Sequence, residues 1–313
     1  MDVSIILVNF NTKVITNNCI NSILEKTFGV SYEIILVDNN STDGSIDFYK
    51  NDSRIRFIEN GVNLGFGCAN NIGVRYAQGK FLFFLNTDTI LINNAVKIFY
   101  DTIQKHEEIG ILGSLLYDKD FKLTTSYIKF SSIKGSILAS INFCKRRCFK
   151  HPKKENIRKT FQIIKKVEVV SGADLFIKKE LFDRVEGFDE DYFMYGEEVE
   201  LEYRISKLGY EMAISSEPKI IHLEGSSSKD IGDRRLNFFT FYSMKRGQCL
   251  FYRKHKSLLY RLLSLLVDIP LDLVFISIDN RFKGKRLKYL KLYNLLFRCS
   301  KITPQKVNMD FYN

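Results

Sequence analysis

Short apolar runs alternate with helical patterns along the first 115 residues of the chain. The runs SIILV, EIILV, IRFI, FLFFL and GILGSLL are rich in β-branched, leucine and aromatic residues. Between them, apolar residues recur at helical spacing, as at Ile15, Cys19 and Ile23. This alternation predicts a parallel sheet with right-handed helical crossovers. Ligands bind at the carboxyl ends of such strands, so the polar residues that follow each run are the candidates for chemistry.

The pattern breaks and then resumes in the middle of the chain. Residues 131–166 lose periodicity and include CKRRCFKHPKKENIRK, which predicts a solvated basic loop. Strand signals return in VEVVSGADLFI and PKIIHLE, and helix signals in KELFDRV and GEEVELEYRISKLG, where Gly209 marks a helix end. We therefore expect one α/β domain over residues 1–233, with halves at 1–115 and 167–228.

The tail, residues 234–313, has the composition of long helices without strand signals. Residues 258–278 are apolar, but Arg261, Ser264, Asp268 and Asp272 recur at spacings of three and four and form one polar stripe, and Pro270 interrupts the run. This favours an interfacial or groove-packed helix pair over a membrane span. The segment NRFKGKRLKYLKLYNLLFRCSK follows with eight positive charges and no acid. The alternative is a solvated basic helix that packs on the same domain.

Net charge indicates the kind of partner, and cysteine usage indicates the cellular compartment. The formal charge of +11 predicts an anionic partner, which could be nucleic acid, anionic lipid or a phosphorylated substrate. Nucleic acid is disfavoured because the sequence has no helix-turn-helix, RNP or zinc-finger pattern. The six cysteines have no CxxC spacing and no signal peptide is evident, so we expect free thiols in a reducing cytoplasm.

Polar residues close the first two predicted strands. The segments VNFN and VDNNSTDGS contain ordinary turn formers, which alone indicate only loops. At a strand end, however, Asp38 can accept a hydrogen bond from a pyrimidine imide, and backbone donors at a helix start can bind a diphosphate. Gly65 and Gly67 in NLGFGCANN permit close backbone approach to a ligand. The spacing is not that of a dinucleotide fingerprint, and no P-loop is present.

Two further segments carry oxygen ligands or acids. FLFFL runs into Asn86, Thr87 and Asp88, which place two oxygen-bearing side chains at a strand end. Hard divalent cations prefer such ligands, although the same residues suit a turn or a helix cap. GEEVELEY gathers glutamates where a helix begins, and the helix dipole alone can account for acids there.

Taken in order, six motifs carry a resemblance to a known family. They are VNFN, VDNNSTDG, NLGFGCANN, FLNTD, SGADLFIKKELFDRVEGFDEDYFMYGEEVELEYRISKLGY and IIHLEGSSS, at compatible spacing over residues 4–228. Together they resemble the family-2 glycosyltransferases of the GT-A fold, particularly the rhamnosyltransferase-like branch that builds surface polysaccharides. The resemblance implies a Rossmann-like mixed α/β sheet with helices on both faces. The tail does not share it and would be a helical appendage.

The resemblance implies a nucleotide-binding half at 1–115 and an acceptor and catalytic half at 167–228. Asp174 would contact a sugar hydroxyl. The residues expected to bind the nucleotide sugar are Asn9, Asn11, Asp38, Asn40, Asn63, Gly65, Phe66, Asn70, Asn86, Thr87, Asp88 and Asp174.

The resemblance also implies a divalent cation, Mg²⁺ or Mn²⁺. Asn86 and Asp88 stand where the family has its Asp-x-Asp metal motif, and His222 matches a position where related enzymes place another ligand. Because Asn86 is neutral, it binds a cation more weakly than a carboxylate would, so metal affinity should depend on the bound diphosphate.

Glu198 occupies the position of the family's catalytic aspartate, and Glu197 precedes it. A glutamate is one methylene longer, so its reach to the acceptor must differ. The implied activity is inverting transfer of a sugar such as rhamnose or galactose from a UDP- or dTDP-sugar. The expected acceptor is a glycan or a polyprenyl-diphosphate-linked sugar in O-antigen or capsule synthesis.

Location and a rival function complete these expectations. We expect a cytoplasmic protein, peripheral at the inner face of the cell membrane, whose basic tail meets the anionic membrane surface. The rival is a catalytically silent scaffold that binds the sugar nucleotide within a polysaccharide assembly complex.

Overall fold

A mixed β-sheet forms the centre of the computed structural model, which describes residues 1–138, 141, 163–223 and 238–278. The strands of the main sheet are β1 (Val3–Asn9), β2 (Tyr32–Asp38), β3 (Arg56–Glu59), β4 (Phe81–Leu85), β5 (Thr89–Leu91), β6 (Ile109–Tyr117), β8 (Ile164–Val167), β10 (Asp174–Lys178) and β11 (Glu211–His222). Their order is β3-β2-β1-β4-β10-β6-β11-β5, and β8 also pairs with β11. A separate pair consists of β7 (Tyr127–Ile128) and β9 (Val169–Val170).

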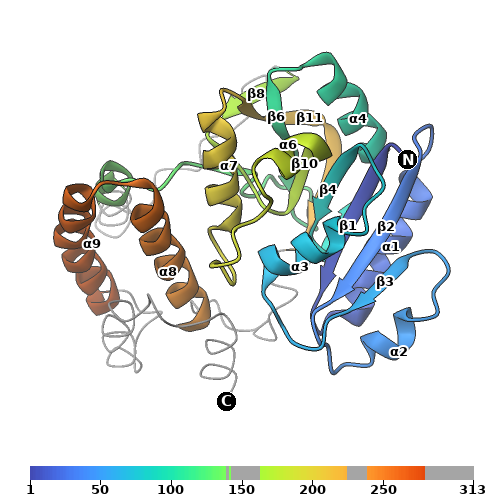
Figure 1. Ribbon diagram of the computed structural model, residues 1–313, viewed down its shortest axis with the longest axis horizontal. Coiled ribbons are helices and arrows are strands. Elements are labelled where there is room, and N and C mark those ends of the chain that lie inside the picture. The colour runs from blue at the N-terminus through green and yellow to red at the C-terminus, as the bar shows by residue number, and fades with distance from the viewer. Residues whose placement is uncertain (139–140, 142–162, 224–237, 279–313) are drawn as a thin grey trace.

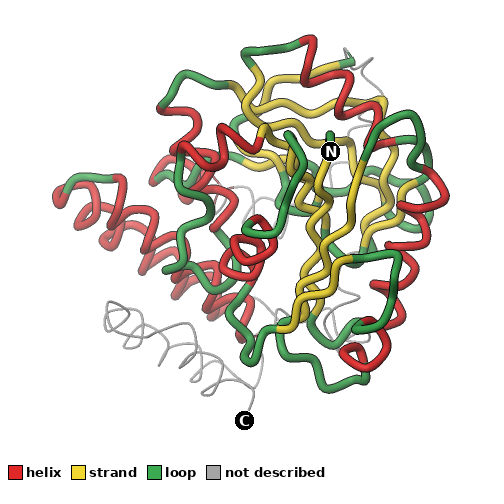
Figure 2. The backbone as a smooth tube through the Cα atoms, turned by 45° about the vertical axis from the view of Figure 1, so that its right-hand side comes forward, coloured by secondary structure: helices red, strands yellow, loops and turns green. Residues whose placement is uncertain are grey.

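Helices cover both faces of this sheet (Figures 1 and 2). They are α1 (Lys13–Lys26), α2 (Ser45–Tyr49), α3 (Phe66–Val74), α4 (Ala95–Lys105), α6 (Lys179–Arg184) and α7 (Glu197–Lys207). Two further helices, α8 (Phe238–His255) and α9 (Leu258–Ile278), lie beside α7, away from the sheet (Figure 1). Buried residues of α1, α2 and α4 pack on one face of the sheet, and those of α3, α6 and α7 pack on the other. The resemblance implied this arrangement.

Strand directions divide the sheet. Strands β1, β2, β3 and β4 pair in parallel, as the alternating pattern predicts. β10 is antiparallel to both β4 and β6, and β11 is antiparallel to β5. The alternation predicted a parallel sheet for the first 115 residues, and β6 does run in the same direction as β4, because β10 is antiparallel to both. The strands that run the other way are β5, β8 and β10, so the sheet is mixed, as the resemblance implied.

The continuous apolar run of β4 reflects burial on both faces. Phe83 packs against Phe99 and Phe176 on one side of the sheet. Phe84 packs against Phe182 and Phe188 on the other. A strand clamped on both sides holds its carboxyl end in a fixed position, and Asn86 to Asp88 follow directly.

Some element boundaries differ from those predicted. The last strand was expected at PKIIHLE but begins at Glu211, with a register shift between Ser215 and Lys219. The predicted helix end at Gly209 is confirmed, because this glycine follows the last residues of α7 with a φ of 89°. α9 continues through Pro270, which was expected to interrupt it.

The appendage packs against α7 rather than against the nucleotide-binding half (Figure 1). Phe251 and Tyr252 of α8 form a buried cluster with Val169 and Val199. In the described part of the chain, no helix combines the length and apolar character needed to cross a membrane. The basic stretch of the predicted loop, from residue 142 to 162, and the basic tail after residue 278 lie outside the described residues.

Candidate active site

The ends of β1 and β2 are tied together by buried side chains. Asn9 and Asp38 are register partners in adjacent parallel strands. The amide Nδ2 of Asn9 donates to Asp38 Oδ2 at 2.5 Å and to Ser41 Oγ at 3.0 Å, and the Ser41 N–H donates to Asp38 Oδ1 at 2.7 Å. Both Asn9 and Asp38 are fully buried. In the structure they hold the two loops, and their contact with a nucleoside stays a prediction.

Asn11 and Asn40 lie at the same edge with left-handed backbones, at φ values of 55° and 68°. Asn11 Oδ1 accepts from the Thr42 N–H at 2.7 Å, which fastens the first loop to the second. Asn40 is exposed. Asparagine tolerates this conformation better than most residues, which explains its presence at both positions.

The loop before α3 is held by Asn39, whose role the sequence did not reveal. Its Nδ2 donates to Asn63 Oδ1 at 3.2 Å and to the Gly65 carbonyl at 3.0 Å. Gly65 has a φ of 85°, and a Cβ there would lie 2.1 Å from the carbonyl oxygen of Phe193. Only glycine fits this position, so the predicted close backbone approach is to the protein's own chain.

Hydrogen bonds also join α3 to the segment 188–196. The Phe66 N–H donates to the Phe193 carbonyl at 2.9 Å. The amide of Asn71 donates to the Phe188 carbonyl and accepts from the Phe188 N–H, at 2.8 and 2.9 Å. Asn70 is buried and donates to the Phe66 carbonyl. The segment 188–196, which leads into α7, is thereby fixed to the predicted nucleotide loop.

The predicted metal residues meet at the end of β4. Asp88 Oδ1 lies 3.2 Å from His222 Nε2, and both side chains are largely buried. The Asn86 N–H donates to the Ala173 carbonyl, and Thr87 Oγ1 lies 3.5 Å from Thr12 Oγ1. The resemblance implied Asp88 and His222 as partners, and the fold brings them together, Asp88 from the turn between β4 and β5 and His222 from the end of β11.

This pair offers one carboxylate and one imidazole to a cation. In the described ranges, no three His, Cys, Asp or Glu side chains gather to hold a metal ion. Asp88 and His222 fit a divalent cation as two of its ligands if the donor's diphosphate oxygens supply others. Metal ligation by Asp88, His222 and Asn86 stays a prediction.

The acidic segment forms the first turns of α7, which begins after Gly196 in the left-handed region. The Gly196 N–H donates to Glu198 Oε2 at 3.1 Å. Gly172, from the SGAD turn, lies against Glu198, since a Cβ on this glycine would be 3.5 Å from Glu198 Cγ. Burial raises the pKa of Glu198, and burial together with the charge of Glu198 raises the pKa of Glu197 well above its usual range.

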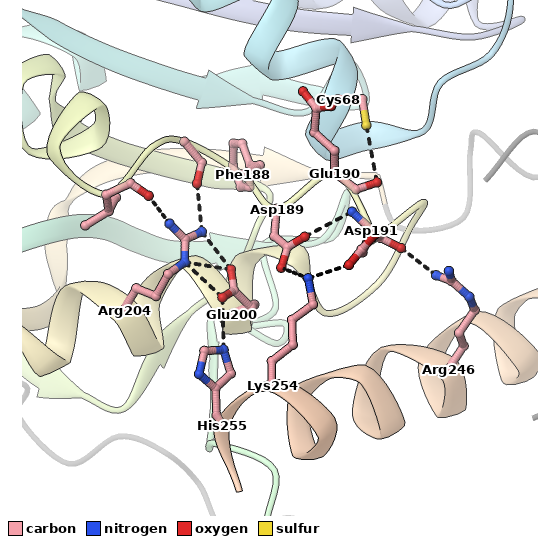
Figure 3. A network of polar contacts seen from close by, with 12 residues as sticks. Cys68, Phe188, Asp189, Glu190, Asp191, Glu200, Arg204, Arg246, Lys254 and His255 are labelled. Atoms are coloured by element: carbon pink, nitrogen blue, oxygen red, sulfur yellow. Dashed lines mark hydrogen bonds and ion pairs between the residues drawn. The ribbon is translucent and has the colours of Figure 1, made fainter. Parts of the chain in front are cut away.

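The other two glutamates of α7 have structural partners. Glu200 pairs with Arg204 at 2.6 Å and with His255 of α8 at 2.9 Å, as Figure 3 shows. Glu202 accepts from the Val170 N–H at 2.8 Å and is fully buried, which raises its pKa well above the usual range. Of the four acids, Glu197 and Glu198 are left as candidates for chemistry.

Asp174 lies inside the sheet, where burial raises its pKa to about 7. Its Oδ2 accepts from the Ser114 N–H at 2.7 Å and from Ser114 Oγ at 2.5 Å. The side chain is fully buried, so the predicted contact with a sugar hydroxyl would require these neighbours to move. That contact stays a prediction.

Comparison with known proteins identifies the class of this chain. The model of glycosyl transferase family 2 matches residues 4–185, more than half of the sequence. The chain therefore belongs to glycosyl transferase family 2 and is a glycosyltransferase. The family expected from the six motifs is confirmed.

Individual relatives support the branch and the fold. The chain is 26% identical over 212 residues to the N-acetylglucosaminyl-diphospho-decaprenol L-rhamnosyltransferase of Mycobacterium tuberculosis, over 62% of this chain and 67% of the relative. Staphylococcus aureus TarS 1–349 has a TM-score of 0.54 at 14% identity, over 96% of this chain and 80% of that chain. GalNAc-T7, solved with UDP, GalNAc and Mn²⁺, has a TM-score of 0.55 at 18% identity, over 86% and 57%. The predicted GT-A fold is confirmed.

Proposed function

We propose that this glycosyltransferase transfers its sugar with inversion, using a UDP- or dTDP-sugar and a divalent cation in the synthesis of a surface polysaccharide. The observation that carries the proposal is the placement of Glu198. It begins α7, lies against the SGAD turn, and belongs to the segment that is clasped to the predicted nucleotide loop. A base in this position can act on an acceptor beside the donor.

The reaction is a single displacement. Ionised Glu198 accepts the proton of an acceptor hydroxyl as its oxygen forms a bond to the anomeric carbon. The bond from that carbon to the diphosphate breaks on the opposite face, and the nucleoside diphosphate leaves with the electron pair. Base catalysis of this kind contributes roughly 10²–10⁴-fold in rate.

The leaving group emerges with additional negative charge. Asp88 and His222 would hold the divalent cation, and the cation, when bound, supplies charge stabilisation to the diphosphate. The loops held by Asn9, Asp38 and Asn39 shape the place where the nucleoside would lie. The Mn²⁺ and UDP of the GalNAc-T7 structure belong to a protein of similar fold and support this choice of cofactor and donor.

The acceptor is a glycan or a sugar linked to a polyprenyl diphosphate. Support comes from the rhamnosyltransferase relative, whose name gives N-acetylglucosaminyl-diphospho-decaprenol as its acceptor. A lipid-linked acceptor places the enzyme at the inner face of the cell membrane, as a cytoplasmic peripheral protein. The basic tail would face the anionic headgroups there.

Donor turnover tests the proposal. Nucleoside diphosphate release is measured from UDP- and dTDP-sugars, with Mg²⁺ or Mn²⁺ and a membrane-lipid extract, for wild type, Glu198→Gln and Asp88→Ala. We expect metal-dependent release from one donor and a loss of at least 10²-fold in each variant. Glu107→Gln, which alters an exposed acid outside the site, should leave the rate unchanged. Full activity in Glu198→Gln would refute the assigned base.

The second candidate is a catalytically silent scaffold that binds the sugar nucleotide. It is favoured by the neutral Asn86 in the metal motif and by glutamate in place of the family's aspartate. Donor binding without release under any of these conditions would identify it.

A further inference from the structure

The polar stripe of α9 faces the protein instead of the surroundings. Asp272 pairs with Lys245 of α8 at 2.7 Å. Gln248 of α8 donates to Asp268 at 3.3 Å, and Ser264 is buried. The hydrophilic side of this helix is therefore used in the contact with α8.

The opposite side of α9 is apolar and exposed. Its side chains recur at positions that share one side of a helix. Leu262 is 52% exposed and Leu266 is 72% exposed. We call this surface the leucine face, formed by Leu258, Leu259, Leu262, Leu263, Leu266 and Leu273. Arg261, Asp268 and Asp272 are the charged residues of α9, and none of them is exposed.

The excess positive charge of the whole chain lies in the same appendage. Residues 1–237 hold 32 lysines and arginines against 32 aspartates and glutamates, and are balanced. Residues 238–313 hold 15 against 4, which accounts for the entire net charge of +11. An uncharged apolar helix face and a concentrated positive charge thus occur in one part of the molecule.

We propose that the leucine face is a docking surface for an anionic lipid bilayer. The leucines enter the boundary between headgroups and acyl chains, and the net positive charge of the appendage sequence favours anionic headgroups. The proposal rests on the membrane location proposed above and names α9, rather than the basic tail alone, as the contact. A nucleic acid would use the cations but not the leucines. A second copy would bring two charges of +11 together.

The docked helix is linked through α8 to α7, which carries the proposed base. α9 contacts α8 through Lys245 and Asp272, and α8 contacts α7 through His255 and Glu200. Docking would therefore place α7 two helix contacts away from the bilayer surface, on the side where a lipid-linked acceptor is presented.

Vesicle binding tests this surface with the full chain and without any substrate. Co-sedimentation is measured with vesicles of pure phosphatidylcholine and of phosphatidylcholine containing phosphatidylglycerol, for wild type and for the double variant Leu262→Asn/Leu266→Asn. The matched control is Val14→Asn/Phe28→Asn, which alters two exposed apolar residues within residues 1–237, where positive and negative charges are equal in number. Thermal unfolding curves check that each variant folds.

We expect binding to the anionic vesicles to fall at least tenfold in the α9 variant and to remain in the control. Unchanged binding by the α9 variant would overturn the proposal. It would also be overturned if wild type bound duplex DNA but not vesicles, or if light scattering gave a dimer that only the α9 change dissociates. Because no donor is present, a failed docking surface is distinguishable from a failed donor or base assignment.

Discussion

At the scale of single residues, neighbouring carboxylates of α7 differ in their surroundings. Glu200 pairs with Arg204 and contacts His255, and Glu202 accepts a backbone N–H inside the domain. Glu197 Oε2 has no hydrogen-bond partner in the part of the chain that the structure describes. Glu198 accepts one backbone N–H and lies beside the SGAD turn. Position on the helix alone would not separate these four acids.

The pH dependence of the rate should report the environment of Glu198. A general base acts only when ionised, and burial raises the pKa of this carboxyl above the ordinary glutamate value of 4.5. Activity should therefore be lost as pH falls through a pKa above 4.5 and be regained as pH rises. The measurement is kcat/KM against pH with a fixed acceptor. An acid limb at or below the ordinary value, or one retained in Glu198→Gln, would contradict this assignment.

At the scale of elements, the segment 188–196 joins the two halves of the site. Gly65 and Phe66 contact Phe193, and Asn71 holds both backbone groups of Phe188. On its other side the segment receives Lys254 of α8, which pairs with Asp189 and Asp191 at 2.5 Å (Figure 3). Three elements distant in sequence therefore determine where α7 begins.

Replacement of Gly65 by alanine should disrupt the contact between Gly65 and the backbone of Phe193. The new Cβ would meet the Phe193 carbonyl at 2.1 Å, and a left-handed backbone costs a non-glycine residue about 1–2 kcal/mol. We expect about a tenfold rise in the donor KM and a lower unfolding temperature. Gly61→Ala is the matched control, because nothing lies within 4 Å of its Cβ position. Equal effects of the two substitutions would refute this contact.

Periodicity predicted the long elements and failed for short or non-local ones. β5 has three residues and α2 has five, too few to display a period. The direction of β10 depends on pairing with β4 and β6, which no local pattern encodes. At the site, Asp88 and His222 were found from the resemblance. Asn71 was missed because it binds backbone groups, and Asn39 because its partners Asn60 and Asn63 lie in another loop. Neither kind of contact leaves a local sequence signal.

At the scale of the whole molecule, the appendage is part of the packed structure. Phe251 and Tyr252 of α8 are buried against Val169 and Val199, and Arg246 donates to the Asp191 carbonyl at 2.7 Å. The amino-acid composition changes near residue 233, as expected, but side chains on the two sides of this boundary pack against each other. Composition changes are visible in a sequence, but buried contacts between the two parts are not.

Truncation should show whether the change of composition near residue 233 is also a boundary between independently stable parts. A chain ending at residue 233 loses the aromatic side chains that cover Val169 and Val199, and each buried aromatic residue removed costs about 3–5 kcal/mol. We expect it to unfold at a markedly lower temperature than the full chain. A chain ending at residue 278 keeps the cluster and should unfold at a higher temperature than the chain ending at residue 233. Equal unfolding temperatures for the two truncations, measured by circular dichroism, would argue against the packed appendage.

The shared segment 188–196 has a thermodynamic consequence for substrate binding. Since one stretch of backbone holds both the predicted nucleotide loop and the start of α7, binding at the proposed donor site would be coupled to the proposed base through it. Such coupling is reciprocal. If donor binding orders this segment and so raises the affinity for the acceptor, acceptor binding raises the affinity for the donor by the same factor. Donor and acceptor would then be bound cooperatively.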